Sequence, residues 1–359
     1  MAKKNQISTK ALYRKLDKLY DESPSFDVKS KKRWVIFSDL HMGDGGSTDD
    51  FKQNANLFST ALKEYYLEKD HALILNGDIE ELQRFQLKKI VNKWKEIYDL
   101  FDRFNAKKSL FKTIGNHDLE LQLMKELPFD YKNYESLRLR FGKHNLFIFH
   151  GHQASKKYQE HNELIGFTLK YFANPLGIKS YSVSHSSQKQ YKIEKRVYGF
   201  SSFNKVVSII GHTHRPLFES LHKVDRLKYK IEQLCRDYSY ADDEDHDEIK
   251  AEIKSHKKEL KKYYKENKDH SFQNYVYNTL FHIPCLFNSG CVVGKRGMTC
   301  LEIEDDKIRL VHWFDKKISK KYLKSSGYEP EQLGDSDYYR LVINEESLDY
   351  IFTRIKFLA

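Results

Sequence analysis

Five short polar motifs, most of them directly after an apolar run, carry the residue types that could do chemistry in this chain. They are Asp39-Leu40-His41, Gly77-Asp78, Gly115-Asn116-His117-Asp118, His150-Gly151-His152 and Gly211-His212-Thr213-His214. Together they offer imidazole, carboxylate and carboxamide groups in about the number and kind that two adjacent metal ions need. Because no thiolate stands among them, the set favours two divalent ions, with manganese first and iron, zinc, nickel or cobalt as alternatives, over a structural zinc cluster.

Strand-like apolar runs must position these motifs. Such runs cover residues 34–37, 72–75, 146–149 and 206–210. A buried strand that stops at a Gly, Asp or His places that side chain at the carboxyl edge of a sheet, where α/β folds keep their chemistry. Strands and helices alternate from residue 33 onward, which predicts a layered α/β architecture.

The five motifs and their order resemble the calcineurin-like metallophosphoesterase superfamily, from about residue 33 to about residue 315. A single motif of this kind is weak evidence, since a Gly-Asp pair is usually a turn. All five in this order are hard to explain by coincidence. The resemblance implies two packed β-sheets flanked by helices, with the metal ions at the sheet edges, and an enzyme that hydrolyses phosphoester or pyrophosphate bonds.

The resemblance also implies a division of the ligands. One metal ion would be held by Asp39, His41 and His214, the other by Asn116, His150 and His212, with Asp78 bridging both. A carboxylate can bridge two cations through its two oxygens, and an Asn carbonyl oxygen binds a metal without quenching its Lewis acidity. The reaction implied is attack on phosphorus by a hydroxide that lies between the metals.

His117 and Asp118 are the catalytic candidates. The resemblance implies that His117 protonates the leaving oxygen or stabilises its charge, while Asp118 orients the imidazole ring. The alternative for His117 is a hydrogen-bonding role behind the ligands. The substrate-binding candidates are His152, Lys156, Lys157 and Arg215.

Seven segments are predicted. They are a helical basic leader (1–32), the first part of the core (33–152), a helical cap insertion (153–204), a core strand with the last motif (205–218), a charged helical-hairpin insertion (219–272), the final core strands (273–315) and a C-terminal tail (316–359). Within the core, apolar spacing predicts a long helix over about 79–104. A strand hairpin is expected over 298–313.

The two insertions are expected to set specificity. In bacterial UDP-2,3-diacylglucosamine pyrophosphatases, which this chain resembles in the residues from Gly211 to Pro216, a helical cap occupies the interval of residues 153–204 and shapes the lipid-binding site. That branch usually has Arg where this chain has His117. The alternative for the cap is a structural subdomain. Residues 219–272 have two charged helical patterns around an acidic turn, which suggests an arm for a homodimer or a protein partner.

Charge and cysteine content narrow the class of protein further. The net charge of +11 suits an anionic phosphate-ester substrate, a nucleic acid or peripheral contact with an acidic membrane, and solvated lysine-rich helices would produce it as well. The four cysteines form no Cys-x-x-Cys pair. With neither a signal peptide nor a membrane-spanning run in the sequence, this pattern predicts a cytoplasmic protein.

Three functional classes follow from these features. The first is a phosphohydrolase that acts on a phosphodiester or pyrophosphate, for example in a nucleotide-linked lipid or sugar. The second is a metal-dependent nuclease acting on DNA or RNA, and the third is a non-catalytic interaction module. A protein serine/threonine phosphatase is disfavoured because the segment 77–81 reads Gly-Asp-Ile-Glu-Glu, without the Asp-Arg pair of those enzymes.

Overall fold

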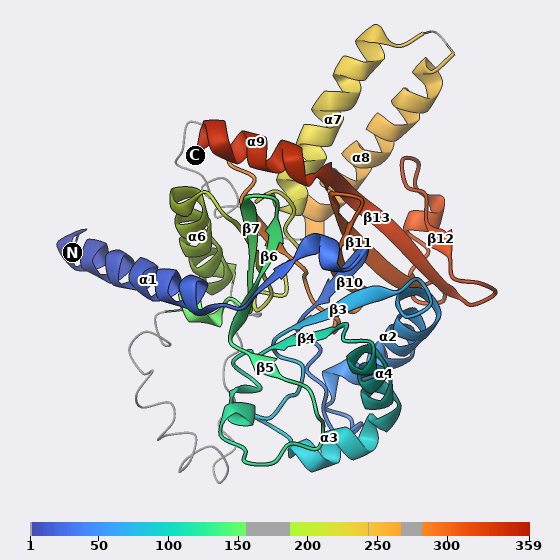
Figure 1. Ribbon diagram of the computed structural model, residues 1–359. Coiled ribbons are helices and arrows are strands. Elements are labelled where there is room, and N and C mark those ends of the chain that lie inside the picture. The colour runs from blue at the N-terminus through green and yellow to red at the C-terminus, as the bar shows by residue number, and fades with distance from the viewer. Residues whose placement is uncertain (1, 156–186, 243, 267–281) are drawn as a thin grey trace.

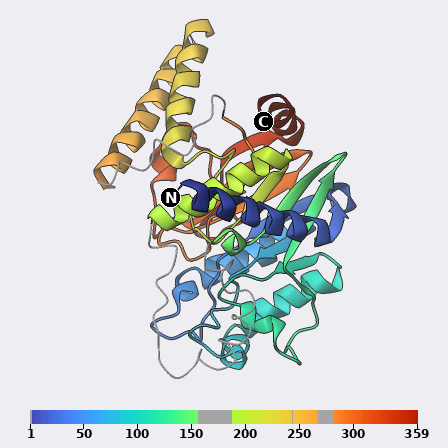
Figure 2. The same ribbon diagram turned by 90° about the vertical axis from the view of Figure 1, so that its left-hand side faces the viewer.

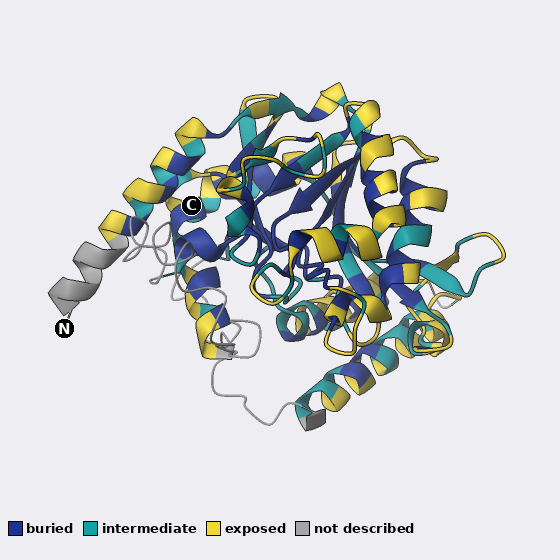
Figure 3. Cartoon of the chain, turned by 90° about the horizontal axis from the view of Figure 1, so that it is seen from below, coloured by how far each residue is buried: buried dark blue, intermediate teal, exposed yellow. Residues whose placement is uncertain are grey.

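Strand β2 (Arg33–Phe37) shows how the sequence builds the layers. Trp34 and Ile36 face one apolar cluster, and Val35 and Phe37 face another. Because successive side chains of a strand point to opposite faces, a run that is apolar throughout must be covered on both sides. The computed structural model describes residues 2–155, 187–242, 244–266 and 282–359, and its central strands are buried (Figures 1 and 3).

Two β-sheets form the centre of the molecule. In spatial order the larger sheet has β12 (Glu331–Gln332), β13 (Tyr338–Ser347), β11 (Lys307–Asp315), β10 (Met298–Glu304), β2, β3 (His71–Asn76), β4 (Leu110–Thr113) and β5 (Asn133–Tyr134). The smaller sheet has β1 (Ser25–Asp27), β6 (Ser136–Phe141), β7 (His144–Phe149), β8 (Val207–Ile210) and β9 (Leu286–Asn288). An apolar cluster shared by both sheets fills the space between them. The expected fold class, two sheets flanked by helices, is confirmed.

Helices cover the outer faces of both sheets. On the larger sheet lie α2 (Ala55–Ala61), α3 (Leu87–Lys93) and α4 (Lys95–Ala106), whose apolar side chains pack in one cluster with Val35 and Phe37. On the smaller sheet, α1 (Ala2–Glu22) lies beside α6 (Ser187–Asn204) (Figures 1 and 2). Short helical turns lie at Val28–Ser30, Asp50–Gln53, Leu62–Tyr66, Leu119–Gln122, His152–Ala154 and Tyr322–Lys324.

The leader and the second half of the cap are packed parts of this body. Leu12, Leu16 and Leu19 of α1 are buried in the same large apolar cluster, together with Val197 and Phe200 of α6. Residues 156–186 of the cap lie outside the described residues.

The helix expected over residues 79–104 is wrong as a continuous element. Residues 79–86 form a loop, and α3 and α4 are separated at Trp94, whose backbone leaves the helical region (φ −105°, ψ 31°). The Trp94 indole donates to the Gly43 carbonyl at 2.9 Å. In residues 79–82, backbone N–H groups donate to the loops of other motifs, and not to one another's carbonyls as in a helix. The Glu81 N–H, for example, donates to the Met42 carbonyl at 3.1 Å.

The C-terminal tail expected over residues 316–359 is a second correction. Strand β13 pairs antiparallel with β11 from Tyr338 to Ser347, and α9 (Leu348–Leu358) follows directly. Leu348, Ile351 and Phe352 of α9 are buried in the cluster between the sheets. The polar residues of β13 concealed the strand, because near the edge of a sheet a strand keeps many of its side chains half-exposed.

The hairpin segment contains α7 (Lys223–Tyr240) and α8 (His246–Glu266), which pack against each other and project from the body (Figures 1 and 2). Strands β10 and β11 form the hairpin expected over 298–313, with Met298 opposite Trp313. Among the described residues, no helix combines the length and the apolar character needed to cross a membrane.

Candidate metal centre

The five motifs meet where the carboxyl ends of parallel strands from the two sheets come together. Strands β2, β3 and β4 run parallel and are followed by the first three motifs, and β7 and β8 run parallel and are followed by the last two. Three groups of candidate ligands result, each with its ligand atoms within 4.8 Å of one another. They are Asp39, His41 and His214; His41, Asp78 and His117; and Asp78, His150 and His212.

Asp39 anchors the first group. Its Oδ1 lies 3.1 Å from His214 Nε2 and 3.8 Å from His41 Nε2, and these two imidazole nitrogens are 3.0 Å apart. The Asp39 carboxylate, fully buried, also accepts the backbone N–H of His212 at 2.9 Å. The first and last motifs are therefore joined by this one side chain.

Asp78 lies between the first group and the third. Its Oδ2 is 3.0 Å from His150 Nε2 and 3.9 Å from His41 Nε2, while Oδ1 accepts the backbone N–H of His117 at 2.7 Å. His150 is held from behind, since its Nδ1 lies 2.8 Å from the Asn76 carbonyl oxygen. Its Nε2 is thereby directed at Asp78.

Two buried polar atoms support a cation at this position. Among the residues that the structure describes, Asn116 Oδ1 and His212 Nε2 have no hydrogen-bond partner. Each such atom costs about 1–3 kcal/mol when it is buried without a partner. Both can offer a lone pair to a metal ion, so the donor set fits divalent cations.

The electrostatics of the centre also favour positive charge. Burial lowers the pKa of His214, but attraction to Asp39 outweighs this and raises the pKa to about 10. For His150, burial is likewise outweighed by Asp78 and Asp39, and its pKa rises to about 9. His212 differs, since burial and the neighbouring His150 lower its pKa to about 3. In the absence of metal, the carboxylates thus keep His214 and His150 protonated. Metal ions bound at the same place would balance the negative charge of these carboxylates instead.

Glu81 is a candidate functional residue that the sequence motifs did not indicate. This buried carboxylate lies 2.8 Å from His117 Nδ1 through Oε1 and 2.9 Å from His41 Nδ1 through Oε2. Burial raises its pKa, but the hydrogen bonds from His117 and His41 prevail and lower the pKa to about 2. The signal available in the sequence was the pair of acids, Glu80 and Glu81, that follows Asp78 closely.

The expectation that Asp118 orients the His117 ring is wrong. Asp118 is fully buried, and its two oxygens accept backbone N–H groups, from Gly115 at 2.5 Å and from Ile79 at 2.8 Å. A short carboxylate in a tight loop satisfies the N–H groups of its own turn before it reaches a neighbouring ring. Asp118 therefore ties the third motif to the second.

The substrate-binding candidates have different surroundings. Arg215 Nη2 donates to Glu194 Oε2 at 2.8 Å and to His222, so its guanidinium is already engaged. His152 is buried, with its ring centre 5.5 Å from that of His150. Lys156 and Lys157 lie outside the described residues.

Backbone strain is concentrated at the centre. Five candidate ligands have left-handed φ angles between +49° and +63°, namely Asp39, His41, Asp78, His212 and His214. For residues other than glycine this conformation costs about 1–3 kcal/mol each and persists only where the surroundings enforce it. Close packing adds a requirement for Gly115, because a Cβ there would lie 2.1 Å from Asp78 Oδ1.

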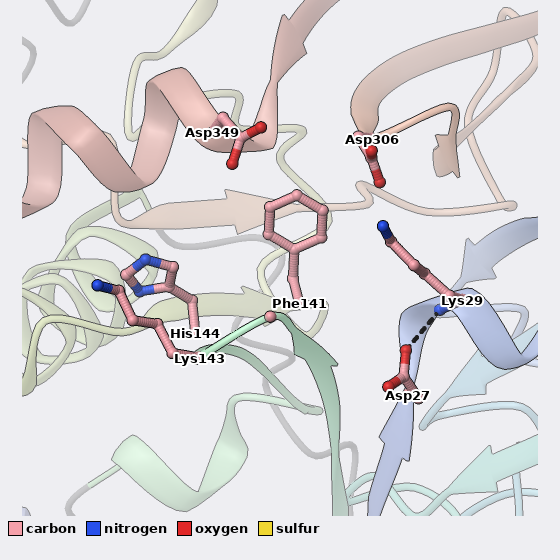
Figure 4. Close-up of a pocket in the computed structure, with 8 residues that line it drawn as sticks. Asp27, Lys29, Phe141, Lys143, His144, Asp306 and Asp349 are labelled. Carbon is pink, nitrogen blue, oxygen red and sulfur yellow. Dashed lines mark hydrogen bonds between the residues drawn. The ribbon is translucent and has the colours of Figure 1, made fainter.

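A surface pocket elsewhere shares no residue with the candidate ligands. It is lined by Asp27, Lys29, Phe141, Gly142, Lys143, His144, Asp306 and Asp349 (Figure 4). Lys29 extends toward Asp306, and Asp27 accepts the backbone N–H of Lys29 at 2.9 Å. Because the lining carries both signs of charge, it favours neither anions nor cations.

The comparison with protein families identifies the class of protein that this fold and site define. The family model described as calcineurin-like phosphoesterase matches residues 32–232. The chain therefore belongs to the calcineurin-like phosphoesterases, and it is a hydrolase of phosphoester bonds. No curated protein matches it in sequence.

Two solved structures are similar to the chain at low identity. One is a conserved uncharacterized protein of Streptococcus pneumoniae TIGR4, described as a predicted phosphoesterase. It is 13% identical, with 79% of this chain and 90% of that chain covered and a TM-score of 0.31. The other is a single mutant of Vps29 from Entamoeba histolytica, 11% identical, with coverage of 79% and 92% and a TM-score of 0.32.

Proposed function

We propose that the chain is a two-metal phosphohydrolase that cleaves a phosphodiester or pyrophosphate bond. The observation that carries the proposal is the position of Asp78, whose Oδ2 faces both His41 and His150. The proposed ligands are Asp39, His41 and His214 for one ion and Asn116, His150 and His212 for the other, with Asp78 shared. Manganese is the first ion proposed, with iron, zinc, nickel and cobalt as alternatives, because imidazole and oxygen donors without thiolate suit all of these ions.

Divalent cations at these ligands would supply Lewis acidity to the phosphoryl group and lower the pKa of the attacking water. The protein's own contribution centres on His117, which donates a proton to the leaving oxygen. Glu81, ionised at neutral pH, accepts a hydrogen bond from His117 Nδ1, and this fixes the ring so that Nε2 faces the leaving group. Since Glu81 also contacts His41, one carboxylate aligns the acid with a ligand.

The proposed substrate is a nucleotide-linked lipid or sugar, as in the bacterial UDP-2,3-diacylglucosamine pyrophosphatases that the chain resembles. Supporting this is the position of the insertion 153–204, which leaves the core directly after β7 and returns to β8. Helix α6, which ends this insertion, exposes Lys189, Lys192 and Lys195. Exposed cations of this kind would attract an anionic headgroup.

A nuclease is the second candidate, and the surface of α8 favours it. Lys254, Lys257, Lys258, Lys261 and Lys262 are exposed along this helix. The carboxylate among them, Glu259, is buried and pairs with Lys223 and Lys321. This face would attract a phosphate backbone.

Hydrolysis of bis-p-nitrophenyl phosphate and p-nitrophenyl phosphate after manganese reconstitution tests the proposal, with Asp78→Asn as the matched variant. Diester cleavage that the variant loses is the expected result. Cleavage of the monoester alone would contradict the proposed bond type. Manganese-dependent cleavage of single- or double-stranded DNA or RNA would favour the nuclease.

A further inference from the structure

Glu194 of α6 is a buried carboxylate to which the hydrolysis described above gives no role. Its side chain is 1% exposed. Glu194 Oε1 accepts the hydroxyl of Thr213 at 2.8 Å, and Oε2 accepts Arg215 Nη2 at 2.8 Å. A carboxylate is rarely buried to this degree unless it is paired and hydrogen-bonded, and here its partners come from the last metal motif and the residue after it.

Thr213, the residue that Glu194 holds, stands between two proposed metal ligands, His212 and His214. One turn before Glu194 on α6, Gln190 Nε2 donates to the Thr213 carbonyl at 2.7 Å. From the other side, Asn288 Nδ2 donates to the Thr213 hydroxyl at 2.9 Å. Thr213 is therefore fixed through both its side chain and its backbone.

The loop needs this support because it is strained. His212 and His214 have φ angles of +63° and +55°. Left-handed residues of this kind relax when the contacts that enforce them are removed. Without the hydrogen bonds to Thr213, the backbone on both sides of it could rotate, and the imidazole rings of His212 and His214 would then change their orientation.

Glu194 also reaches the helical hairpin. His222, the residue that precedes α7, has Nε2 3.3 Å from Glu194 Oε2, and Arg215 donates to the same ring nitrogen at 2.6 Å. One carboxylate thus contacts the metal loop and the base of α7 while belonging to the last helix of the cap insertion.

We propose that Glu194 is a positioning residue that sets the orientation of His212 and His214 by holding Thr213, and that it joins the metal centre to α6 and α7. The inference rests on the proposed function, since it takes these two histidines as metal ligands. It also gives Arg215 a place in the same support rather than at the substrate. Residues that orient metal ligands typically change metal affinity about 10–100-fold when they are removed.

Metal binding by the full-length chain tests this inference. Manganese affinity and stoichiometry are measured by calorimetry on metal-stripped protein, with urea unfolding as a measure of stability. We expect Glu194→Ala to bind manganese about 10–100-fold more weakly than wild type. Glu194→Gln keeps an acceptor for the Thr213 hydroxyl, so it should recover part of that loss.

Glu302→Ala is the matched control. Glu302, on β10 of the larger sheet, is equally buried and also accepts a hydroxyl and a guanidinium, those of Tyr66 and Arg340. It should lose stability and keep the wild-type manganese affinity. Wild-type affinity in Glu194→Ala would overturn the inference, and so would an equal loss of affinity in Glu302→Ala, because that loss would reflect stability alone.

A second pair of variants covers the case in which Glu194→Ala does not fold. Thr213→Val removes the hydroxyl at nearly constant shape, and Thr213→Ser restores it. Weak manganese binding in the valine variant and recovery in the serine variant are expected, and equal affinities in both would overturn the inference. A wild-type protein that binds no divalent metal would overturn the proposed function itself and this inference with it.

Discussion

At the scale of single residues, carboxylates in this centre determine which imidazole nitrogen faces inward. Glu81 lies within 2.9 Å of the Nδ1 atoms of both His41 and His117, and the Asn76 carbonyl oxygen does the same for His150 at 2.8 Å. In each ring the Nδ1 atom is occupied, so Nε2 is the atom that remains for a metal ion or a leaving group. The orientations of these three rings are thus set before any ligand arrives.

The role of His117 can be tested by its removal. His117→Ala should retain its metal ions and lower kcat by roughly 10²–10⁴, which is the usual contribution of a general acid. The loss should be greatest for substrates with poor leaving groups, because these need the proton most. Rates measured across p-nitrophenyl, phenyl and alkyl phosphodiesters would show this, and a uniform loss would contradict the role.

Glu81 should affect both chemistry and metal binding. Glu81→Gln weakens its contacts with His117 and His41 together, so we expect a lower kcat and a manganese affinity about 10–100-fold lower. Calorimetry and steady-state kinetics on the same preparation would measure both. If kcat fell while manganese affinity stayed at the wild-type value, the contact with His41 would have no role in holding the metal.

The residue types of the centre could be predicted from the sequence, but some of their contacts could not. Asp39, His41, Asp78, His150, His212 and His214 come together as expected. Glu81 was missed because its role depends on a loop that bends it back between two rings. Asp118 was assigned to His117 because the two are adjacent in sequence, yet adjacency does not determine where a buried carboxylate finds its hydrogen bonds.

At the scale of elements, β2, β3, β7 and β8 were predictable because each is a short apolar run that ends at a polar motif. The break between α3 and α4 was not, since residues 79–104 keep a helical spacing of apolar side chains. What interrupts the helix is tertiary. The Trp94 indole bonds to Gly43, and the backbone of residues 79–82 bonds to the loops of the first and third motifs.

Asp118 should act through the loops that it joins. Asp118→Asn replaces one acceptor oxygen by a donor facing the Gly115 or Ile79 N–H, so we expect a loss of about 1–3 kcal/mol in the free energy of unfolding. Urea unfolding of the metal-free protein would measure this. A variant of unchanged stability with slower turnover would instead indicate that Asp118 acts on His117.

At the scale of the whole molecule, the two sheets must pack before the first and third groups of candidate ligands exist, because each of these two groups takes ligands from both sheets. The second half of the core could be placed only in part from sequence. Residues 316–359 were expected as a tail, although β13 and α9 complete the larger sheet and the cluster between the sheets. The sequence of β13 and α9 alone does not indicate which strand β13 pairs with or which apolar cluster α9 joins.

The charge balance of the centre predicts how metal binding depends on pH. The pKa values of His214 and His150 are raised to about 10 and about 9 in the metal-free protein, so both rings hold protons at neutral pH. A metal ion must displace these protons, and manganese affinity should therefore rise with pH until both rings have lost them, near pH 10. Calorimetry in buffers of different ionisation enthalpy would detect the released protons. An affinity independent of pH would contradict this account.

The most direct test of the two-metal centre is a count of bound metal in wild type and Asp78→Asn. After reconstitution with manganese and removal of excess ion, elemental analysis gives the number of ions per chain. We predict two in the wild type and depletion at both sites in the variant, because Asp78 is the proposed shared ligand. A single ion in the wild type, or two ions retained by the variant, would contradict the shared role of Asp78.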